Sequence, residues 1–338
     1  MTPVRLVHAR SAIDAARLLQ EHAPHAQLIA AGGDLLGLWK AGVLEHAGAA
    51  PVWVDLSRTG ELVQIERHAD GGWRLGALAT LQPLQRTPGI APMLAEAVAR
   101  IASPQLRVRT TLGGNLLQRP RCWTFRHPDL RCFKKGGDGC PAIGGPLQAH
   151  PGAIGGAGPC HAAHPSDLAT VLLALNARVE VATADGAMRS LPLGELYRGA
   201  ASNRAHEASL APDEVLVAVH VPPSAATQAF EKAAPRAANE FAAASAAVLL
   251  RLDGGRIAHA RIALGGVAAE PLLCPAADAL LQGRVRTEVD VAPIAQQLAA
   301  FRGATVDTRA RVSWCRWVIE RALARALDDP AAPRHARA

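Results

Sequence analysis

The stretch of residues 118–165 constrains the fold of this chain more than any other part, because it is long and lacks hydrophobic periodicity. It is rich in Gly, Pro, Cys and His, and periodic segments flank it on both sides. A structureless stretch of this length inside a compact domain needs a bound ligand or a function to order it. The sequence therefore predicts a loop that is ordered by something it binds.

Four of the six cysteines of the chain lie inside this stretch, within a span of 39 residues: Cys122, Cys132, Cys140 and Cys160. A local group of four thiols in a chain with no visible export signal indicates a metal or cluster site more than disulfides. Structural zinc sites usually show close C-x2–4-C pairs, which are absent here. The wide spacing suits an iron–sulfur cluster whose ligands come from separate corners of a loop. Spacing alone leaves a cluster, a zinc ion and inert thiols open.

Two glycine turns, in residues 27–36 and 110–116, are candidates for binding an anion. In the first, an expected strand runs through Gly32 and Gly33 into the start of a helix. The second offers two hydroxyls, two glycines and an amide side chain. Such turns expose consecutive backbone N–H groups and let a diphosphate approach. Neither matches a Walker A loop or a Rossmann fingerprint, and an ordinary tight turn remains the alternative for each.

Length and composition exclude several classes of protein. The 338 residues predict about two domains. With 49% apolar and 19% charged residues, a mainly disordered chain is excluded. No apolar run reaches the ~18 residues of a membrane span. The net charge of +7 is scattered along the chain and does not indicate nucleic acid as a partner. Without a visible signal peptide, the default expectation is a cytoplasmic protein.

The hydrophobic pattern predicts an α+β fold. Hairpins are expected around residues 70–72, 185–186 and 253–255, because each has a turn of Asp and Gly between apolar runs. Further strands are expected at residues 27–31, 52–56 and 215–221. Helices are expected at residues 11–22, 92–102, 166–176 and 308–327.

Residues 111–123 and 132–140 together resemble a known family. The chain is similar to the FAD-binding medium subunit of the molybdenum hydroxylases, the xanthine dehydrogenase family. More narrowly, it resembles the branch with an extra [4Fe–4S] cluster, which includes bacterial aldehyde oxidoreductases and 4-hydroxybenzoyl-CoA reductase. Residues 164–168, 230–242 and 263–268 match further family segments in the same order, so the resemblance covers nearly the whole chain.

The resemblance implies a domain organisation. A PCMH-type FAD-binding domain of two α+β subdomains is expected at residues 1–222, followed by a C-terminal α+β domain of the CO dehydrogenase flavoprotein type at residues 223–330. The subdomains would span about 1–57 and 58–222, with the iron–sulfur loop at 118–165 and a tail at 331–338.

The resemblance also assigns residues to two cofactors, and places no catalytic residue on this chain beyond the flavin. FAD would be bound by the first turn, by the second turn, by a carboxylate and by a lysine. Those residues are Ile29, Ala30, Ala31, Gly32, Gly33, Asp34, Leu35 and Leu36; Thr110, Thr111, Gly113, Gly114 and Asn115; Asp167; and Lys232. Cys122, Cys132, Cys140 and Cys160 would ligate the [4Fe–4S] cluster, with Lys134 and Lys135 offsetting its negative charge.

One departure from the family pattern lies in the first turn. Ala31 stands where the family has its first glycine, and Gly33 stands where it has a threonine. If that first position needs a positive φ, Ala31 would be strained by roughly 1 kcal/mol or more.

The implied role is electron transfer within a heterotrimer, most directly in aldehyde oxidation. The partners would be a large molybdenum-cofactor subunit, a small [2Fe–2S] subunit and an external electron acceptor. A partner that carries an export signal would place the complex in the periplasm. The alternatives are an FAD-only subunit whose cysteines bind zinc or nothing, and a non-catalytic scaffold with a decayed flavin site.

Overall fold

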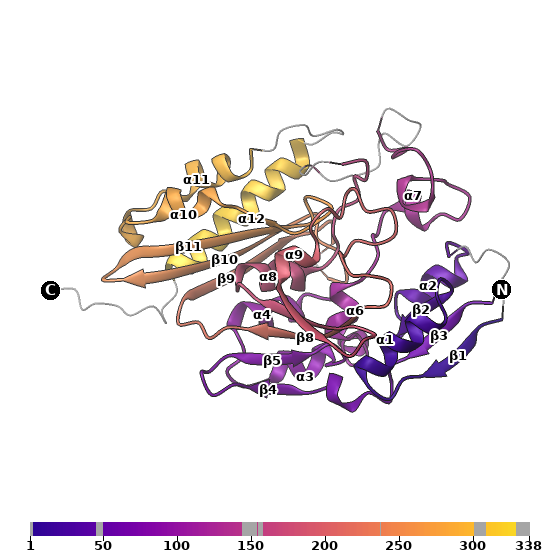
Figure 1. Cartoon of the computed structure of the whole chain (residues 1–338). Helices are drawn as coiled ribbons and strands as arrows, with labels where there is room; N and C mark the ends of the chain where they lie inside the picture. Colours follow the sequence, from indigo (N-terminus) through magenta and orange to yellow (C-terminus); the bar gives the residue numbers. More distant parts are fainter. Residues whose placement is uncertain are drawn as a thin grey trace.

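The computed structural model describes residues 3–44, 50–143, 154, 158–236, 238–300 and 309–328. These residues form a mixed helix-and-sheet fold with three sheets (Figure 1), which confirms the predicted α+β class. The loop residues 144–153 and 155–157 and the tail 331–338 lie outside the described residues. Among the described helices, none is both long and apolar enough to cross a lipid bilayer.

The first sheet is small and parallel, with the order β1-β3-β2. Helix α1 (Ala12–Glu21) connects β1 to β2 and contacts β2 and β3. Ser11 caps this helix, because its side chain accepts a hydrogen bond from the backbone N–H of Asp14. The strands are β1 (Arg5–His8), β2 (Ala26–Ile29) and β3 (Val52–Asp55).

The second sheet is antiparallel, with the order β4-β5-β8-β6-β7 and the apolar strand β8 at its centre. Its hairpins β4–β5 and β6–β7 are the ones predicted from the Asp-Gly turns. The strands are β4 (Ile65–Arg67), β5 (Trp73–Gly76), β6 (Arg178–Ala182), β7 (Met188–Pro192) and β8 (Val215–Val221). The helices that share its core are α3 (Leu81–Arg86), α4 (Pro92–Ala99), α6 (Leu112–Leu116), α8 (Asp167–Ala174) and α9 (Leu193–Leu196).

The third sheet is antiparallel, with the order β12-β11-β10-β9. Three helices cover one of its faces (Figure 1), and α8 packs against β10 and β11. Every residue of α8 is buried, so this helix joins the third sheet to the rest of the protein. The strands are β9 (Thr227–Ala233), β10 (Ala244–Asp253), β11 (Arg256–Gly265) and β12 (Leu272–Leu273). The covering helices are α10 (Ala276–Leu281), α11 (Val291–Leu298) and α12 (Arg309–Asp328).

The segment between α6 and α8 holds little regular structure in its described part, as its lack of periodicity predicts. Its described residues contain only the short helix α7 (Trp123–Arg126) and the 3-10 turn η2 (Phe133–Lys135). Helix α7 lies beside α2 (Leu35–Lys40), the helix that follows the first glycine turn (Figure 1). The fold thus brings the cysteine-rich loop next to the candidate anion-binding turn.

Candidate cofactor-binding site

The first glycine turn leads from β2 into α2 and requires glycine at one position. Gly32 has φ +73, and a Cβ there would lie 2.7 Å from Leu36 Cδ1. Gly33 is exposed, and a Cβ there would meet nothing within 4 Å, so a ligand has room to approach the backbone. Ala31 does not lie in the left-handed region. The backbone strain considered for Ala31 is therefore absent, because Gly32 is the residue that makes the turn.

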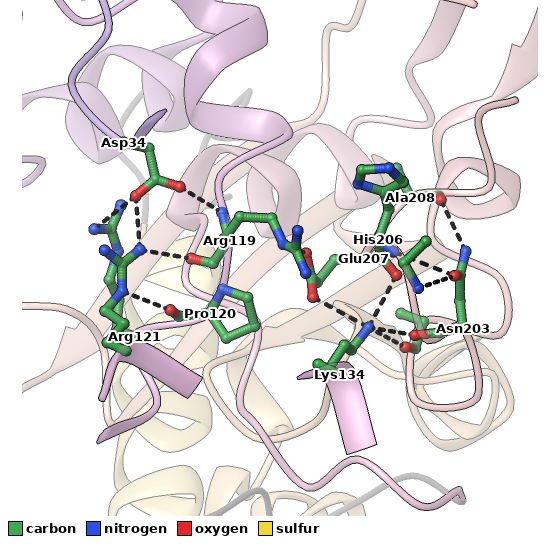
Figure 2. A network of polar contacts seen from close by, with 12 residues as sticks. Asp34, Arg119, Pro120, Arg121, Lys134, Asn203, His206, Glu207 and Ala208 are labelled. Carbon is green, nitrogen blue, oxygen red and sulfur yellow. Dashed lines mark hydrogen bonds and ion pairs between the residues drawn. The ribbon is translucent and has the colours of Figure 1, made fainter. Parts of the chain in front are cut away.

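Asp34 precedes α2 but does not cap it. The first N–H groups of a helix have no intrahelical acceptors. At the start of α2 the N–H of Leu36 donates to the Gly32 carbonyl (2.9 Å), which leaves the N–H groups of Asp34 and Leu35 for an anion. The Asp34 carboxylate instead accepts hydrogen bonds from the backbone N–H of Arg119 (2.7 Å) and from Arg126 Nη2 (2.6 Å), and Arg121 Nη1 lies 3.0 Å away (Figure 2). One carboxylate thus faces two guanidinium groups, which leaves a net positive charge beside the turn.

The second glycine turn is held close to β5. Thr111 caps α6 by accepting a hydrogen bond from the N–H of Gly114 (3.1 Å). The N–H of Gly113 donates to the Ala77 carbonyl (2.7 Å), and a Cβ on Gly113 would lie 3.0 Å from that oxygen. This approach favours glycine. Thr110 uses its hydroxyl locally, donating to the Leu106 carbonyl (2.9 Å).

The second turn is joined to α8 and through it to the third sheet. The Ser166 hydroxyl, at the start of α8, donates to Asn115 Oδ1 (2.7 Å). The next residue, Asp167, is buried and forms an ion pair of 2.7 Å with Lys232 of β9. Burial raises the pKa of Asp167, while Lys232 and Arg100 oppose that rise. The structure therefore brings Asp167 and Lys232, each of which was predicted to bind FAD, into contact with each other.

The two turns belong to one set of contacts. Gln118 Nε2 donates to the Asn115 carbonyl (2.8 Å), and the next residue, Arg119, donates its backbone N–H to Asp34. Small residues, open space at Gly33, free helix N–H groups and local positive charge are what a dinucleotide diphosphate needs. The residues present fit FAD. Ile29, Ala30, Ala31, Leu35 and Leu36 lie partly buried along the same turn.

The four cysteines of the loop line one hollow, although they come from separate corners of the chain. Cys122 precedes α7 and Cys132 precedes η2. All four are free thiols, and each is buried or half-buried. Burial raises the pKa of Cys160 to about 11 and also raises the pKa of Cys122. The other residues that line the hollow are Pro120, Thr124, Phe125, Phe133, Lys134 and Ala162.

The thiols surround this hollow without meeting at a point. In the part of the chain that the structure describes, no three His, Cys, Asp or Glu side chains are grouped closely enough to hold a single metal ion. The donor set is nevertheless one of four soft sulfur ligands, which iron–sulfur clusters and zinc prefer. By its chemistry, this donor set suits either group.

Lys134 lines the hollow, and its side chain is only 2% exposed. Its Nζ lies 3.1 Å from Glu207 Oε1, and Glu207 Oε2 lies 2.7 Å from Arg119 Nε (Figure 2). This buried group of two cations and one carboxylate carries a net positive charge. The Lys134 Nζ also donates to the carbonyl oxygens of Ala200 (2.8 Å), Asn203 (2.8 Å) and His206 (2.9 Å).

Lys135, which was also expected to offset charge, donates instead to the His127 carbonyl. Sequence reasoning missed the arginines at positions 119, 121 and 126 and the carboxylate of Glu207. Three arginines within eight residues after the second turn were a signal that could have been used. Glu207 gave none, because it lies far along the chain in a polar segment.

Two family models match the chain. The model described as the FAD binding domain in molybdopterin dehydrogenase matches residues 2–224. The model of the CO dehydrogenase flavoprotein C-terminal domain matches residues 228–329.

Curated relatives and solved structures agree with these models. The chain is 37% identical over 271 residues to the FAD-binding subunit of an Escherichia coli (strain K12) aldehyde oxidoreductase, covering 79% of this chain and 82% of the relative. It is 30% identical over 334 residues to the alpha subunit of a 6-hydroxypseudooxynicotine dehydrogenase complex from Paenarthrobacter nicotinovorans, covering 95% and 93%. A chain of the Cu,Mo-CO dehydrogenase crystal structure matches with a TM-score of 0.72 and 25% identity, covering 97% and 99%.

Proposed function

The chain belongs to the FAD-binding medium subunits of the molybdenum hydroxylase family, and from this premise we propose that it carries electrons through FAD and one [4Fe–4S] cluster. It would pass them between the subunits that hold molybdenum and [2Fe–2S] centres and an external acceptor. The similarity to an aldehyde oxidoreductase subunit supports aldehyde oxidation as the reaction of the complex.

FAD supplies reversible electron transfer when it is bound, and this chain's residues would position it. The backbone N–H groups of residues 31–35 would bind the diphosphate, with Gly33 giving it room. The positive charge around Asp34, from Arg121 and Arg126, would favour the anion. Thr111, Gly113, Gly114 and Asn115 would form the second wall. Asp167 and Lys232, already paired, would present fixed polar groups to the flavin.

The observation that carries the cluster proposal is that four thiols from separate parts of the loop line a single hollow. Four cysteine thiolates are the usual ligand set of a [4Fe–4S] cluster. The buried ammonium of Lys134 at the same hollow would favour thiolates over neutral thiols, and it lowers the pKa of Cys160 against the effect of burial. Such a cluster supplies a one-electron carrier when it is bound.

The partners follow from the family. We infer that the chain assembles with a large molybdenum-cofactor subunit and a small [2Fe–2S] subunit, because its two family models together cover residues 2–224 and 228–329 with flavoprotein domains. The organic substrate would then react on the large subunit. Size-exclusion chromatography of the native protein should show three different subunits together, and a monomer that oxidises an aldehyde unaided would contradict the assignment.

The decisive experiment counts iron, zinc and flavin per chain after anaerobic purification. We expect about four iron atoms and one FAD in the wild type, and loss of the iron in Cys132→Ser. Cys274→Ser is the matched control, because Cys274 is a half-buried thiol outside the loop. This variant should keep the iron content of the wild type. Acid precipitation should release the flavin, since neither turn holds a His or Cys to link it. Zinc in the wild type, or full iron in Cys132→Ser, would overturn the cluster.

A further inference from the structure

Asp34 lies between the two proposed cofactor sites and is bound from the side of the cysteine loop. Its carboxylate accepts from Arg126 Nη2 at 2.6 Å. Arg126 is the last residue of α7, and its backbone N–H donates to the Cys122 carbonyl at 3.0 Å. Its Nε donates to the Pro120 carbonyl at 2.8 Å. One guanidinium therefore connects the residue that starts α2 with the helix that follows a proposed cluster ligand.

A second route joins the same two places. The backbone N–H of Arg119 donates to Asp34 Oδ2 at 2.7 Å, while its side chain lies 2.7 Å from Glu207. Glu207 in turn contacts Lys134, which lines the cysteine hollow. Figure 2 shows this continuous row of charged groups from Asp34 to Lys134. The cysteine loop and the first glycine turn are thus held together at Asp34 from both sides.

Two backbone hydrogen bonds hold the glycine turn and the start of α2: the Leu36 N–H donates to the Gly32 carbonyl (2.9 Å), and the Leu38 N–H donates to the Asp34 carbonyl (3.1 Å). Gly33 is exposed and has open space where its side chain would be, and Asp34 makes no capping bond to α2. The side chain of Asp34 adds to these bonds the contacts that tie the turn to the cysteine loop, so the position of the N–H groups of residues 33–35 depends in part on the anchoring of Asp34. The anchoring side chains are partly buried, with Asp34 18% and Arg126 25% exposed, so solvent screens these contacts less than those of a surface ion pair.

We propose that the Asp34–Arg126 pair couples the two cofactor sites, so that a cluster-loaded loop holds the first glycine turn in the geometry that binds FAD. This inference rests on the proposed function. Coupling between two binding sites is reciprocal, so bound FAD holds the cluster in its loop by the same factor. Arg126 is a positioning residue in this scheme, because its side chain binds the Asp34 carboxylate and the carbonyl oxygens of Arg119 and Pro120.

The test is a cycle of four full-length proteins: wild type, Cys132→Ser, Arg126→Gln and the double variant. Flavin fluorescence gives the dissociation constant of FAD for each protein after removal of its flavin. We expect loss of the cluster to weaken FAD binding about tenfold in the presence of Arg126, within the usual range of such couplings. In the Arg126→Gln background, loss of the cluster should weaken FAD binding by clearly less than in the presence of Arg126, because only the contacts of Asp34 with Arg119 and Arg121 remain.

If Arg126 had only a structural role, Arg126→Gln would weaken FAD binding equally with and without the cluster. The tenfold ratio between the two dissociation constants would then stay intact, and that result would overturn the proposal. Arg131→Gln is the matched control, because Arg131 is an exposed arginine in the same loop, and it should keep the ratio. Arg126→Lys is the second variant, for use if Arg126→Gln does not fold. It keeps the positive charge but not the guanidinium's set of donors, so it should fold and give an intermediate ratio of FAD dissociation constants with and without the cluster. As the reciprocal readout, added FAD should slow iron loss to a chelator about tenfold in the wild type and by clearly less in Arg126→Gln.

Iron counts on the same samples separate the two levels of inference. A wild type without iron refutes the cluster, and the coupling with it. A wild type with about four iron atoms whose FAD affinity is the same as that of Cys132→Ser refutes the coupling and leaves the proposed function standing.

Discussion

Lys134→Met should be one of the most destabilising single changes in this chain, even before any cofactor is bound. The Lys134 side chain is 2% exposed and that of Glu207 is 7% exposed, so solvent compensates neither charge. Removing the ammonium leaves Glu207 with Arg119 as its remaining cation and deprives three loop carbonyls of their donor. Breaking a buried ion pair by removing one partner costs about 3–5 kcal/mol, and we expect a loss of unfolding free energy in this range.

The assay is urea unfolding of the cluster-free protein at pH 7, followed by tryptophan fluorescence. Glu207→Gln should cost less, about 1–3 kcal/mol, because Lys134 keeps its three carbonyl acceptors. The double variant should lose less than the sum of the two single variants, since each removes the same contact. Lys40→Met is the control, because Lys40 is exposed, and it should stay within about 0.5 kcal/mol. A Lys134→Met loss no larger than that of the control would refute this reasoning.

Two further predictions concern packing and pH. Gly76→Ala should destabilise the protein by about 1–3 kcal/mol, because the new Cβ would lie 2.2 Å from the Leu62 carbonyl oxygen. Gly60→Ala is the control and should be near neutral, because a Cβ at Gly60 would have open space around it. Equal urea midpoints for the two variants would contradict this prediction. Two hydrogen bonds from Arg189, each 2.7 Å, lower the pKa of Glu214. The ionised Glu214 carboxylate therefore contributes to stability above its unfolded pKa of about 4.5, and this contribution is lost as pH falls through the lower pKa of the folded protein. Wild type should therefore exceed Glu214→Gln in unfolding free energy by more at pH 7 than at pH 2. A pH-independent difference would exclude the carboxylate as its source.

Local sequence signals predicted the elements that local physics controls. The Ser11 cap and apolar stripe predicted α1, and the turn at residues 253–255 predicted the hairpin of β10 and β11. Strand β1 (Arg5–His8) was not predicted, because its burial does not alternate and its pairing with β3 joins residues far apart in the chain. The short helices α5 (Pro104–Arg107) and α7 were missed for a similar reason, since one turn of helix gives no periodicity.

The candidate site shows the same division. The glycine turns and the four cysteines were visible because glycine spacing and thiol clustering are local properties. That Gly32 rather than residue 31 takes the left-handed conformation follows from the backbone path between β2 and α2, which the sequence does not show. The role of Asp34 depends on contacts with Arg119 and Arg126, which lie 85 and 92 positions away in the chain. The role of Glu207 depends on its contact with Lys134, 73 positions away. The assignment of Asp34 to the FAD site and of the four cysteines to a cluster is tested by the experiments above.

Arg119 links the electrostatics of the two sites, because its backbone serves one and its side chain the other. Its N–H holds Asp34, and its guanidinium contacts Glu207 and lies 4.7 Å from the centre of the Phe125 ring. Around Asp34, and again around Glu207, one carboxylate faces two cations, so each group keeps one positive charge. Both proposed cofactors are anionic in their protein-bound form, a diphosphate and a cluster with four thiolates. Lys134 is buried and the three arginines are partly buried, so salt screens these cations less than exposed charges. The attraction for both cofactors should therefore persist at physiological ionic strength.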